Sequence, residues 1–479
     1  MKRSHFILDE LENFPELLER AKSLTSEYLI RLSERPVSRT TYPSLKDLSV
    51  SLSETGMGTL ETLARFEREI LPYLSASGGS RYWGFVTGGT TPAALVGDWL
   101  TSAVDQNLMV GGDSVATEVE LATLNLIKDL FVLPRDAFEG VLTTGATASN
   151  LVCLAIARQW GGTQLGKNFA SEGITNLNEF EILATTPHAS LLKVMGILGF
   201  GQNNWTKVRG LPDANGLEGE AIDLKDLNAK LKASQASVKI VVSSAGTVTT
   251  TAFDDLEAIA DICHCYNAWH HLDGAFGLYA SCSPRYAYLA QGSQLADSIT
   301  VDCHKWLNVP YDCGVALTQH PKLLRETFAV GAAYLKTNDS SPNMMNRGIE
   351  NSQRFRALPV WFSLTAYGKE GYCKLIEANC LQARQLADWI EASDSYRLLL
   401  PPTLNVVLFA GKFGGDLESV SDRNRALLQT INQTGRVFLT SSNYRGQFCF
   451  RAAFSNWRTN TEDIATVIQT LSSCSKMSN

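Results

Sequence analysis

The sequence lacks the features that mark membrane-spanning, secreted and nucleic-acid-binding proteins. It has no apolar run of about 18 residues, so we expect no helix that spans a membrane. Its 42 basic and 49 acidic residues include no long basic run, which argues against a nucleic-acid partner and against a polybasic membrane anchor. The opening stretch mixes acids and bases and lacks the apolar core of a signal peptide. These absences favour a cytoplasmic globular protein.

The ten cysteines form no C-x-x-C pair and are scattered from Cys153 to Cys474. In the tightest cluster, Cys263 and Cys265 flank His264, a spacing that fits no standard zinc site. We therefore predict no metal site and interpret the cysteines as reduced thiols of a cytosolic protein.

The composition is that of a folded protein, with 44% hydrophobic and 19% charged residues, and 479 residues suffice for two or three domains. Residues 1–80 predict helices joined by loops, including a helical pattern over 58–74. The Gly- and Ser-rich stretch 75–84 interrupts that pattern. We predict an N-terminal helical segment at 1–80, a large α/β domain at 81–355 and a small C-terminal α+β domain at 356–479.

Short apolar strands alternate with helices between residues 83 and 310. The pattern predicts helices at 114–133, 149–160 and 253–267. It predicts strands at 140–145, 180–186, 237–245, 269–273 and 298–302. Such alternation favours a mostly parallel sheet covered on both faces, whose ligands bind at the carboxyl ends of the strands.

Chemically useful residues follow these predicted strands. Residues Thr144–Asn150 combine small side chains with a helix N-terminus, which suits a phosphate monoester, although an ordinary turn and helix cap explain them equally well. His188, Asp273 and Lys305 each stand at a further strand end. His188 alone is explained by a capping role, and Asp273 alone by a turn. An amine among apolar and aromatic neighbours, as at Lys305, is available as a nucleophile.

Together these positions offer what pyridoxal 5'-phosphate (PLP) requires. They supply a phosphate site, a contact for a flat ring, an acid for a cationic ring nitrogen and an amine for an aldehyde. Three stretches, residues 270–280, 296–314 and 353–368, strongly resemble the group II PLP-dependent amino-acid decarboxylases. The resemblance runs from about Trp83 to Trp457. It implies the aspartate-aminotransferase type fold (fold type I), PLP as cofactor and a homodimer with shared active sites.

The resemblance also implies a role for individual residues. Lys305 is similar to the lysine that binds the cofactor, Asp273 to the partner of the ring nitrogen, Ala275 to the residue beneath the ring and His188 to the histidine stacked over it. The remaining implied cofactor contacts are Ala146, Thr147, Thr247 and His304. The family reaction is decarboxylation of an amino acid through an external aldimine and a quinonoid.

The side-chain pocket is predicted in segment 81–92, with Phe85 and Thr87 as candidates for the substrate contact. Gly84 falls where aromatic-amino-acid decarboxylases tend to carry a large aromatic residue, while Trp83 fits either the pocket or the core. No arginine besides Arg81 is available there for an acidic substrate, so an apolar or aromatic amino acid is favoured.

The loop 336–355 departs from the family because it contains no tyrosine, where decarboxylases often carry one that serves protonation. Met344 or Arg347 takes that position. The absence motivates an alternative reaction, an oxygen-consuming aldehyde synthase or another carbon–carbon lyase or condensing enzyme. A third alternative, a non-catalytic protein on this fold, is disfavoured by the presence of Lys305, Asp273 and His188.

Overall fold

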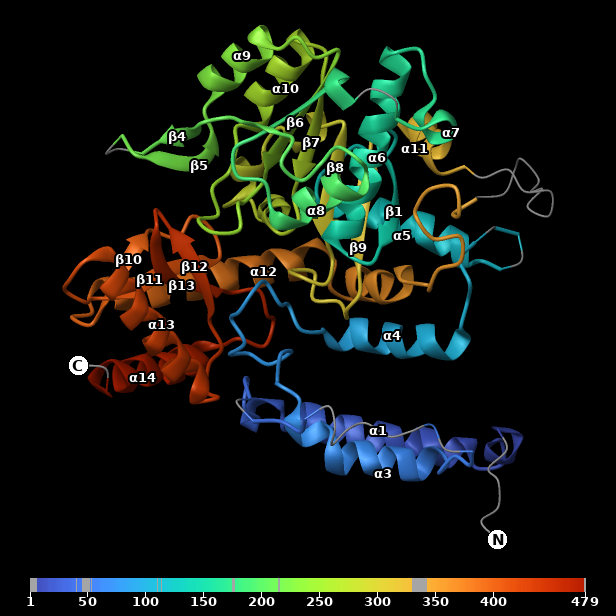
Figure 1. The fold of residues 1–479 in the computed structure, drawn as a ribbon. Helices are drawn as coiled ribbons and strands as arrows, with labels where there is room; N and C mark the ends of the chain where they lie inside the picture. The colour runs from blue at the N-terminus through green and yellow to red at the C-terminus, as the bar shows by residue number, and fades with distance from the viewer. Residues whose placement is uncertain are drawn as a thin grey trace.

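The computed structural model describes residues 7–39, 41–44, 52, 54–109, 111–112, 114–174, 177–213, 216–329 and 343–477. An N-terminal pair of helices, α1 (Phe14–Ile30) and α3 (Thr59–Glu69), lies beside the body of the molecule (Figure 1). The predicted opening helix begins only at Phe14, with Pro15 in its first turn, where a missing amide hydrogen costs nothing. A 3₁₀ turn at Ile7–Glu10 precedes it. No helix among the described residues is long and apolar enough to cross a membrane.

A seven-stranded sheet forms the centre, in the order β1-β9-β8-β7-β6-β2-β3. Its strands are β1 (Glu139–Thr143), β2 (Phe180–Ala184), β3 (Thr206–Lys207), β6 (Val238–Ser244), β7 (Ala268–Asp273), β8 (Ser298–Asp302) and β9 (Gly314–Thr318). The pairs from β8 through β3 are parallel, and only β9 runs antiparallel to its neighbours. The prediction of a mostly parallel sheet is confirmed. The sequence analysis did not predict β9, a five-residue strand that is buried along its whole length.

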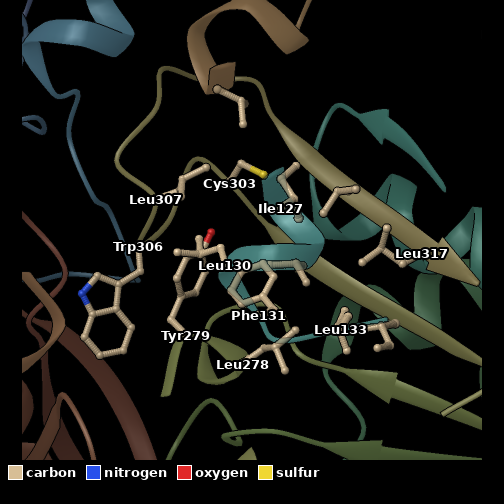
Figure 2. Packing of buried hydrophobic residues seen from close by; sticks show 14 of the residues in the cluster. Ile127, Leu130, Phe131, Leu133, Leu278, Tyr279, Cys303, Trp306, Leu307 and Leu317 are labelled. Atoms are coloured by element: carbon tan, nitrogen blue, oxygen red, sulfur yellow. The ribbon is translucent and has the colours of Figure 1, made fainter. Parts of the chain in front are cut away.

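Helices cover both faces of this sheet. The covering helices include α5 (Ala116–Leu130), α6 (Ala146–Gln164), α8 (Ala189–Ile197), α9 (Leu224–Ala233), α10 (Leu256–Cys265) and α11 (Pro321–Phe328). Helix α4 (Pro92–Val104) packs against α12 (Ala357–Glu391) instead. Adjacent residues of β1 point into different cores: Leu142 packs with α5, and Val141 packs with α6. Figure 2 shows the first core, where Ile127 of α5 and Phe131 just after that helix pack in one cluster with Tyr279 and Trp306. This two-sided burial fixes the register of the strands and so the position of their ends.

The C-terminal part carries a separate four-stranded antiparallel sheet in the order β10-β11-β13-β12. Its strands are β10 (Tyr396–Leu400), β11 (Val406–Gly411), β12 (Thr440–Tyr444) and β13 (Gln447–Ala453), and its helices are α13 (Leu417–Gln433) and α14 (Thr461–Met477). The sequence suggests two helices near its start, and the structure joins them as α12 (Ala357–Glu391), kinked at Gly368. The smaller α+β unit is therefore present, while the predicted boundaries at 80/81 and 355/356 stay predictions.

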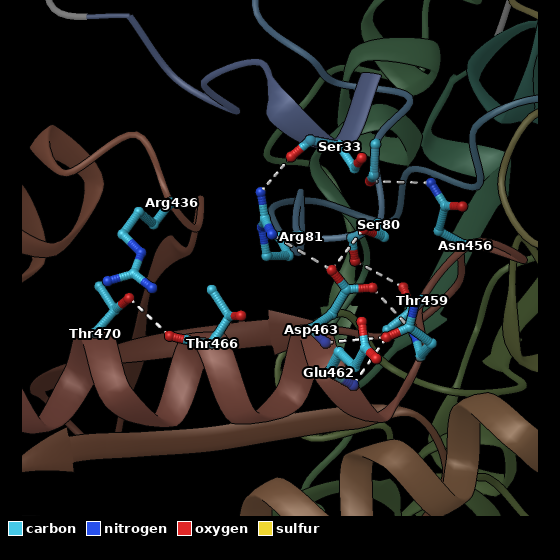
Figure 3. Close-up of polar contacts among 12 residues, drawn as sticks. Ser33, Ser80, Arg81, Arg436, Asn456, Thr459, Glu462, Asp463, Thr466 and Thr470 are labelled. Carbon is cyan, nitrogen blue, oxygen red and sulfur yellow. Dashed lines mark hydrogen bonds and ion pairs between the residues drawn. The ribbon is translucent and has the colours of Figure 1, made fainter. Parts of the chain in front are cut away.

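The segment around residue 80 is held to α14 and to the turn before it by a polar cluster (Figure 3). Ser80 Oγ donates to Asp463 Oδ1 at 2.8 Å, and Arg81 Nη1 lies 3.6 Å from the same carboxylate oxygen. Arg81 Nη2 donates to the carbonyl oxygen of Ser33 at 2.7 Å, which ties the N-terminal helices to the body. This anchoring fixes the start of loop 81–92, which continues to the functional site.

A two-stranded ribbon reaches from the large sheet toward the small one (Figure 1). It consists of β4 (Gly210–Pro212) and β5 (Glu218–Ile222). Arg445, in the turn between β12 and β13, bonds Asp213 at 2.8 Å. The ribbon therefore links the two sheets on the side where the functional site lies.

Candidate active site

A narrow cleft lies at the carboxyl ends of β6, β7 and β8. Six of the predicted site residues line it: Ala146, His188, Thr247, Asp273, Ala275 and Lys305. They come from five separate stretches of the chain. As expected for the carboxyl ends of parallel strands, residues more than 150 positions apart in the sequence meet in this cleft.

Lys305 follows the end of β8, and its Nζ lies 3.0 Å from Asp302 Oδ2. Loop 81–92 closes over its backbone, because a Cβ on Gly88 would stand 1.8 Å from the carbonyl oxygen of Lys305. Trp306 points the other way, into the core, where its Nε1 donates to Asn379 Oδ1 at 2.8 Å. The aromatic neighbour of Lys305 thus anchors the turn and leaves the amine on the cleft.

Asp302 was not among the predicted site residues, yet its buried carboxylate joins several of them. Oδ1 accepts from the amide of Ala146 at 2.6 Å and lies 3.4 Å from Nε2 of His304. His304 Nδ1 accepts from the amide of Cys313 at 3.2 Å, and its ring stacks on Tyr311 at 4.3 Å. Burial lowers the pKa of His304, an effect that Asp302 opposes. His304 therefore lies behind the cleft, in contact with its floor.

The turn before α6 fits the phosphate of PLP. Gly145 has φ 146°, and a Cβ there would stand 2.8 Å from Cε1 of His304, so the turn requires glycine. Helix α6 begins at Ala146 and runs for 19 residues, which directs a partial positive charge at the cleft. Thr147 is exposed in the first turn of α6 but does not line the cleft. These donors, with the Lys305 amine, suit an aldehyde that carries a phosphate.

His188 caps α8 from the side of the cleft. Its Nδ1 accepts from the amide of Ser190 at 3.2 Å and lies 2.7 Å from the Ser190 hydroxyl. Because Nδ1 accepts, the neutral ring carries its proton on Nε2. Partial burial lowers the pKa of His188, and the charge of Asp273 opposes that effect. The residue therefore both caps a helix and presents a neutral imidazole donor.

Asp273 ends β7 and accepts from the amide of Ala275 at 3.2 Å, which holds its carboxylate at the cleft. Thr247 lies on the opposite side, where its hydroxyl donates to Glu220 Oε2 at 2.5 Å. Glu220, from β5, also accepts from the amide and hydroxyl of Thr250. Its carboxylate thereby fixes the 247–251 turn, and nothing in its local sequence marks that role.

The predicted substrate residues do not line this cleft. Phe85 is 62% exposed and lies 6.3 Å from the ring of Phe438. Thr87 lines a neighbouring cleft together with Tyr311, whereas Val86 between them reaches the Lys305 cleft. The assignment of Phe85 and Thr87 to the substrate stays a prediction.

The space that Gly84 leaves is already filled, because a Cβ there would stand 2.5 Å from the ring of Phe438. Trp83 belongs to the core of the small sheet: it is 1% exposed and packs on Phe454 at 4.3 Å. Neither residue opens the cleft of Lys305.

Arg451 is a cation beside the cleft that the sequence analysis missed. It projects from β13, and its Nε and Nη1 donate to the carbonyl oxygens of Val248 and Phe85 at 2.6 and 2.5 Å. Its Nη2 is buried without a hydrogen-bond partner among the described residues. Burial lowers the pKa of Arg451 to about 10, and its charge acts on His188. No sequence signal connects this small-sheet residue with Lys305.

The loop 336–355 is described from Asn343 onward. Met344 is fully buried, and Arg347 Nη1 lies 3.3 Å from Glu139 Oε2. Both candidates for the position of the family tyrosine therefore have structural contacts, and neither lines the cleft of Lys305. Residues 336–342 lie outside the described part of the chain.

Comparison with known proteins agrees with this site. A family model described as the pyridoxal-dependent decarboxylase conserved domain matches residues 45–412. An aromatic-L-amino-acid decarboxylase of Bacillus atrophaeus is 27% identical over 95% of this chain and 94% of its own. A 3,4-dihydroxyphenylacetaldehyde synthase of Aedes aegypti is 28% identical over 95% and 88% of the two chains. The crystal structure of Oryza sativa TDC with PLP and tryptamine has a TM-score of 0.89, with 22% identity over 100% of both chains.

The fold and the cleft define a PLP-dependent enzyme of fold type I. Since the family model matches most of its length, the chain belongs to the pyridoxal-dependent decarboxylase family. Its cofactor is PLP, and it is a carboxy-lyase of amino acids.

Proposed function

We propose that this enzyme removes the α-carboxylate of an aromatic amino acid and releases the amine. The observation that carries the proposal is the convergence of Lys305, Asp273 and His188 on one cleft. Val86, Val248 and Phe276 supply apolar walls to that cleft, which suits an apolar or aromatic side chain. The relatives named as aromatic-L-amino-acid and tryptophan decarboxylases support the same substrate class.

Each residue has a distinct task in this proposal. Lys305 would hold the cofactor through its Nζ, and the N-terminus of α6, with Ala146 and Thr147 in its first turn, would hold the phosphate. The amide of Ala146 already donates to Asp302, so other amides of that turn would be the donors. Asp273 would keep a proton on the ring nitrogen, and Ala275 would support the ring from below. The bound cofactor supplies an electron-accepting ring that stabilises the negative charge left when carbon dioxide departs.

The remaining residues act on the substrate. Arg451 has a free Nη2 for a carboxylate, and its other two nitrogens are fixed by Val248 and Phe85. His188 would return a proton to the reacting carbon in its imidazolium form, since a neutral ring does not give up its Nε2 proton. Thr247, held by Glu220, borders the same space.

A product assay tests the proposal. Purified enzyme with PLP is incubated with each common amino acid, and carbon dioxide, amine and hydrogen peroxide are followed in parallel, with Lys305→Ala as the blank. We expect carbon dioxide and amine in equal amounts from an aromatic amino acid, without peroxide. Turnover confined to acidic or basic amino acids would contradict the substrate class.

The second candidate function is an oxygen-consuming aldehyde synthase. It is favoured by the missing tyrosine in loop 336–355 and by the similarity to an aldehyde synthase of Aedes aegypti. In the same assay it yields carbon dioxide with matching peroxide, ammonia and aldehyde. A product that keeps its carboxylate would instead indicate another carbon–carbon lyase or condensing reaction.

We also propose that the enzyme is a cytoplasmic homodimer with shared active sites. Helix α4 exposes Val96, Trp99, Leu100 and Val104, an apolar surface of the kind that a second copy covers. None of the ten cysteines, all of them in the described part of the chain, forms a disulfide, as expected in a reducing compartment. Sedimentation of wild-type protein and Trp99→Glu tests the dimer, which the charge should dissociate.

A further inference from the structure

Asp302 touches both ends of the space proposed for the cofactor. Its Oδ2 lies 3.0 Å from Nζ of Lys305, at the aldehyde end. Its Oδ1 accepts from the amide of Ala146 at 2.6 Å, at the phosphate end. The side chain is 4% exposed, so both interactions take place out of water, where they are stronger than at the surface.

The surroundings leave this carboxylate little freedom. The amide of Asp302 donates to the carbonyl oxygen of Ala275 at 3.0 Å, and its carbonyl oxygen accepts from the hydroxyl of Tyr279 at 3.1 Å. A Cβ on Gly145 would stand 3.3 Å from Oδ1, so the preceding turn packs directly on the carboxylate. The position of Asp302 is therefore fixed by β8 and by the buried core.

We propose that Asp302 is a positioning residue that sets the separation between the amine of Lys305 and the N-terminus of α6 through its single carboxylate. PLP has a fixed distance between its aldehyde and its phosphate. A side chain that holds both attachment points selects ligands whose two ends match that distance. The inference rests on the proposed role of Lys305, and it adds a residue that governs how well the cofactor fits.

The test compares PLP with pyridoxal, which has the same aldehyde without the phosphate. The Lys305 amine condenses with either aldehyde and loses water. Sodium borohydride then delivers hydride to the carbon–nitrogen double bond, and mass spectrometry counts the labelled Lys305 peptide. Labelling against concentration gives a half-saturating value for each ligand, and their ratio is the selectivity for PLP.

Two variants of Asp302 test separately the length and the charge of its side chain. Asp302→Glu moves the carboxylate by about 1.5 Å, and we expect selectivity for PLP to fall about tenfold because one end no longer matches. Asp302→Asn keeps the shape and an oxygen for the Ala146 amide but removes the ion pair with Lys305. Labelling by both ligands should then fall about fivefold, with selectivity nearly unchanged.

Asp226→Asn is the matched control. Its carboxylate is also buried, accepts from the amide of Arg209 and pairs with Lys230, but it lies on α9 and does not line the cleft of Lys305. It should lower the unfolding temperature and leave selectivity unchanged. Unchanged selectivity in Asp302→Glu, or unchanged labelling in Asp302→Asn, would overturn the inference. If Asp302→Glu does not fold, the labelling of Asp302→Asn decides alone. No label on Lys305 in wild-type enzyme would instead contradict the proposed function.

Discussion

The edge of the sheet around Lys305 and the segment 343–356 differ in how many of their buried polar atoms have partners. At the edge, Asp302, His304 and Thr247 bond to backbone amides or neighbouring side chains, while Thr185 Oγ1 and Arg451 Nη2 are buried without a hydrogen-bond partner among the described residues. In the segment, polar atoms are buried without a hydrogen-bond partner among the described residues. They are Asn343 Oδ1, Asn346 Oδ1, Gln353 Nε2 and Arg356 Nη1, together with Glu120 Oε2 from α5.

The difference indicates that the edge of the sheet is the more rigid of the two regions. A buried polar atom without a partner costs about 1–3 kcal/mol, so the segment 343–356, which has more such atoms, loses more stability than the edge. The edge is built from strand ends, whose positions follow from the core on both faces of the sheet. Residues that must meet a cofactor of fixed shape lie on the rigid region, as preorganised catalysis requires.

The strongest test of the comparison removes one carboxylate from the edge. Asp273→Asn should lower kcat about 10³-fold, because the ring nitrogen loses the anion that keeps it protonated. The control is Asp297→Asn at the opposite end of the same sheet, where Asp297 accepts from the amide of His270 at 2.7 Å. Steady-state kinetics on fully PLP-loaded enzyme measures both. Comparable losses in the two variants would show that Asp273 serves stability alone.

A second change disturbs the rigid edge without touching a functional group. Gly88→Ala places a Cβ against the carbonyl oxygen of Lys305, at 1.8 Å in the present backbone. We expect the free energy of unfolding to fall about 3 kcal/mol, with weaker PLP binding, since backbone must move. Gly414→Ala is the control, because a Cβ there meets nothing within 4 Å. Chemical denaturation measures the free energy of unfolding of both variants. Equal values would mean that the backbone of loop 81–92 moves to accommodate the Cβ without cost.

A third change addresses the segment with unsatisfied atoms. Burial raises the pKa of Glu120 to about 7. Between the usual carboxyl pKa, about 4.3, and 7, the folded chain holds a proton that the unfolded chain releases, so stability falls as pH rises through that window. Glu120→Gln keeps an oxygen for the amide of Leu142 and removes this loss.

Relative to wild type, Glu120→Gln should therefore gain about 3 kcal/mol between pH 4.5 and 8, the free energy of about two and a half pKa units. Urea unfolding at several pH values measures the difference. Glu118→Gln, on an exposed position of the same helix, should show no such gain. A pH-independent difference for Glu120→Gln would mean that Arg356 and Arg347 hold the carboxylate charged.

The same contrast explains which features the sequence predicts. Apolar runs in the sequence predict the strands that end at Asp273 and Asp302. Residues that follow parallel strands lie at the same edge of the sheet. Hence His188, Asp273 and Lys305 are found from spacing and resemblance together. Asp302 has a signal in the sequence as well, because it is an acid at the end of a predicted strand, three residues before Lys305, although that position alone indicates no role.

Contacts between distant irregular segments are not readable in this way. Glu220 reaches Thr247 from a ribbon, and Arg451 reaches Val248 from the other sheet. Phe438 fills the space beside Gly84, although nothing near residue 84 indicates it. These contacts depend on how the small sheet packs against the large one, and local periodicity carries no information on that packing. The substrate side of the site is for this reason harder to predict than the cofactor side.

The smallest expected effect tests that substrate side. Phe85 is 62% exposed and touches little of the core, so Phe85→Ala should leave the unfolding midpoint nearly unchanged. If its ring contacts an aromatic substrate, KM should rise about fivefold at unchanged kcat, the loss of one aromatic contact. Tyr288→Ala, another exposed aromatic at 67%, is the control for both measurements. A lower unfolding midpoint with an unchanged KM would assign Phe85 to packing against Phe438, and the substrate pocket would then lie deeper, along Val86.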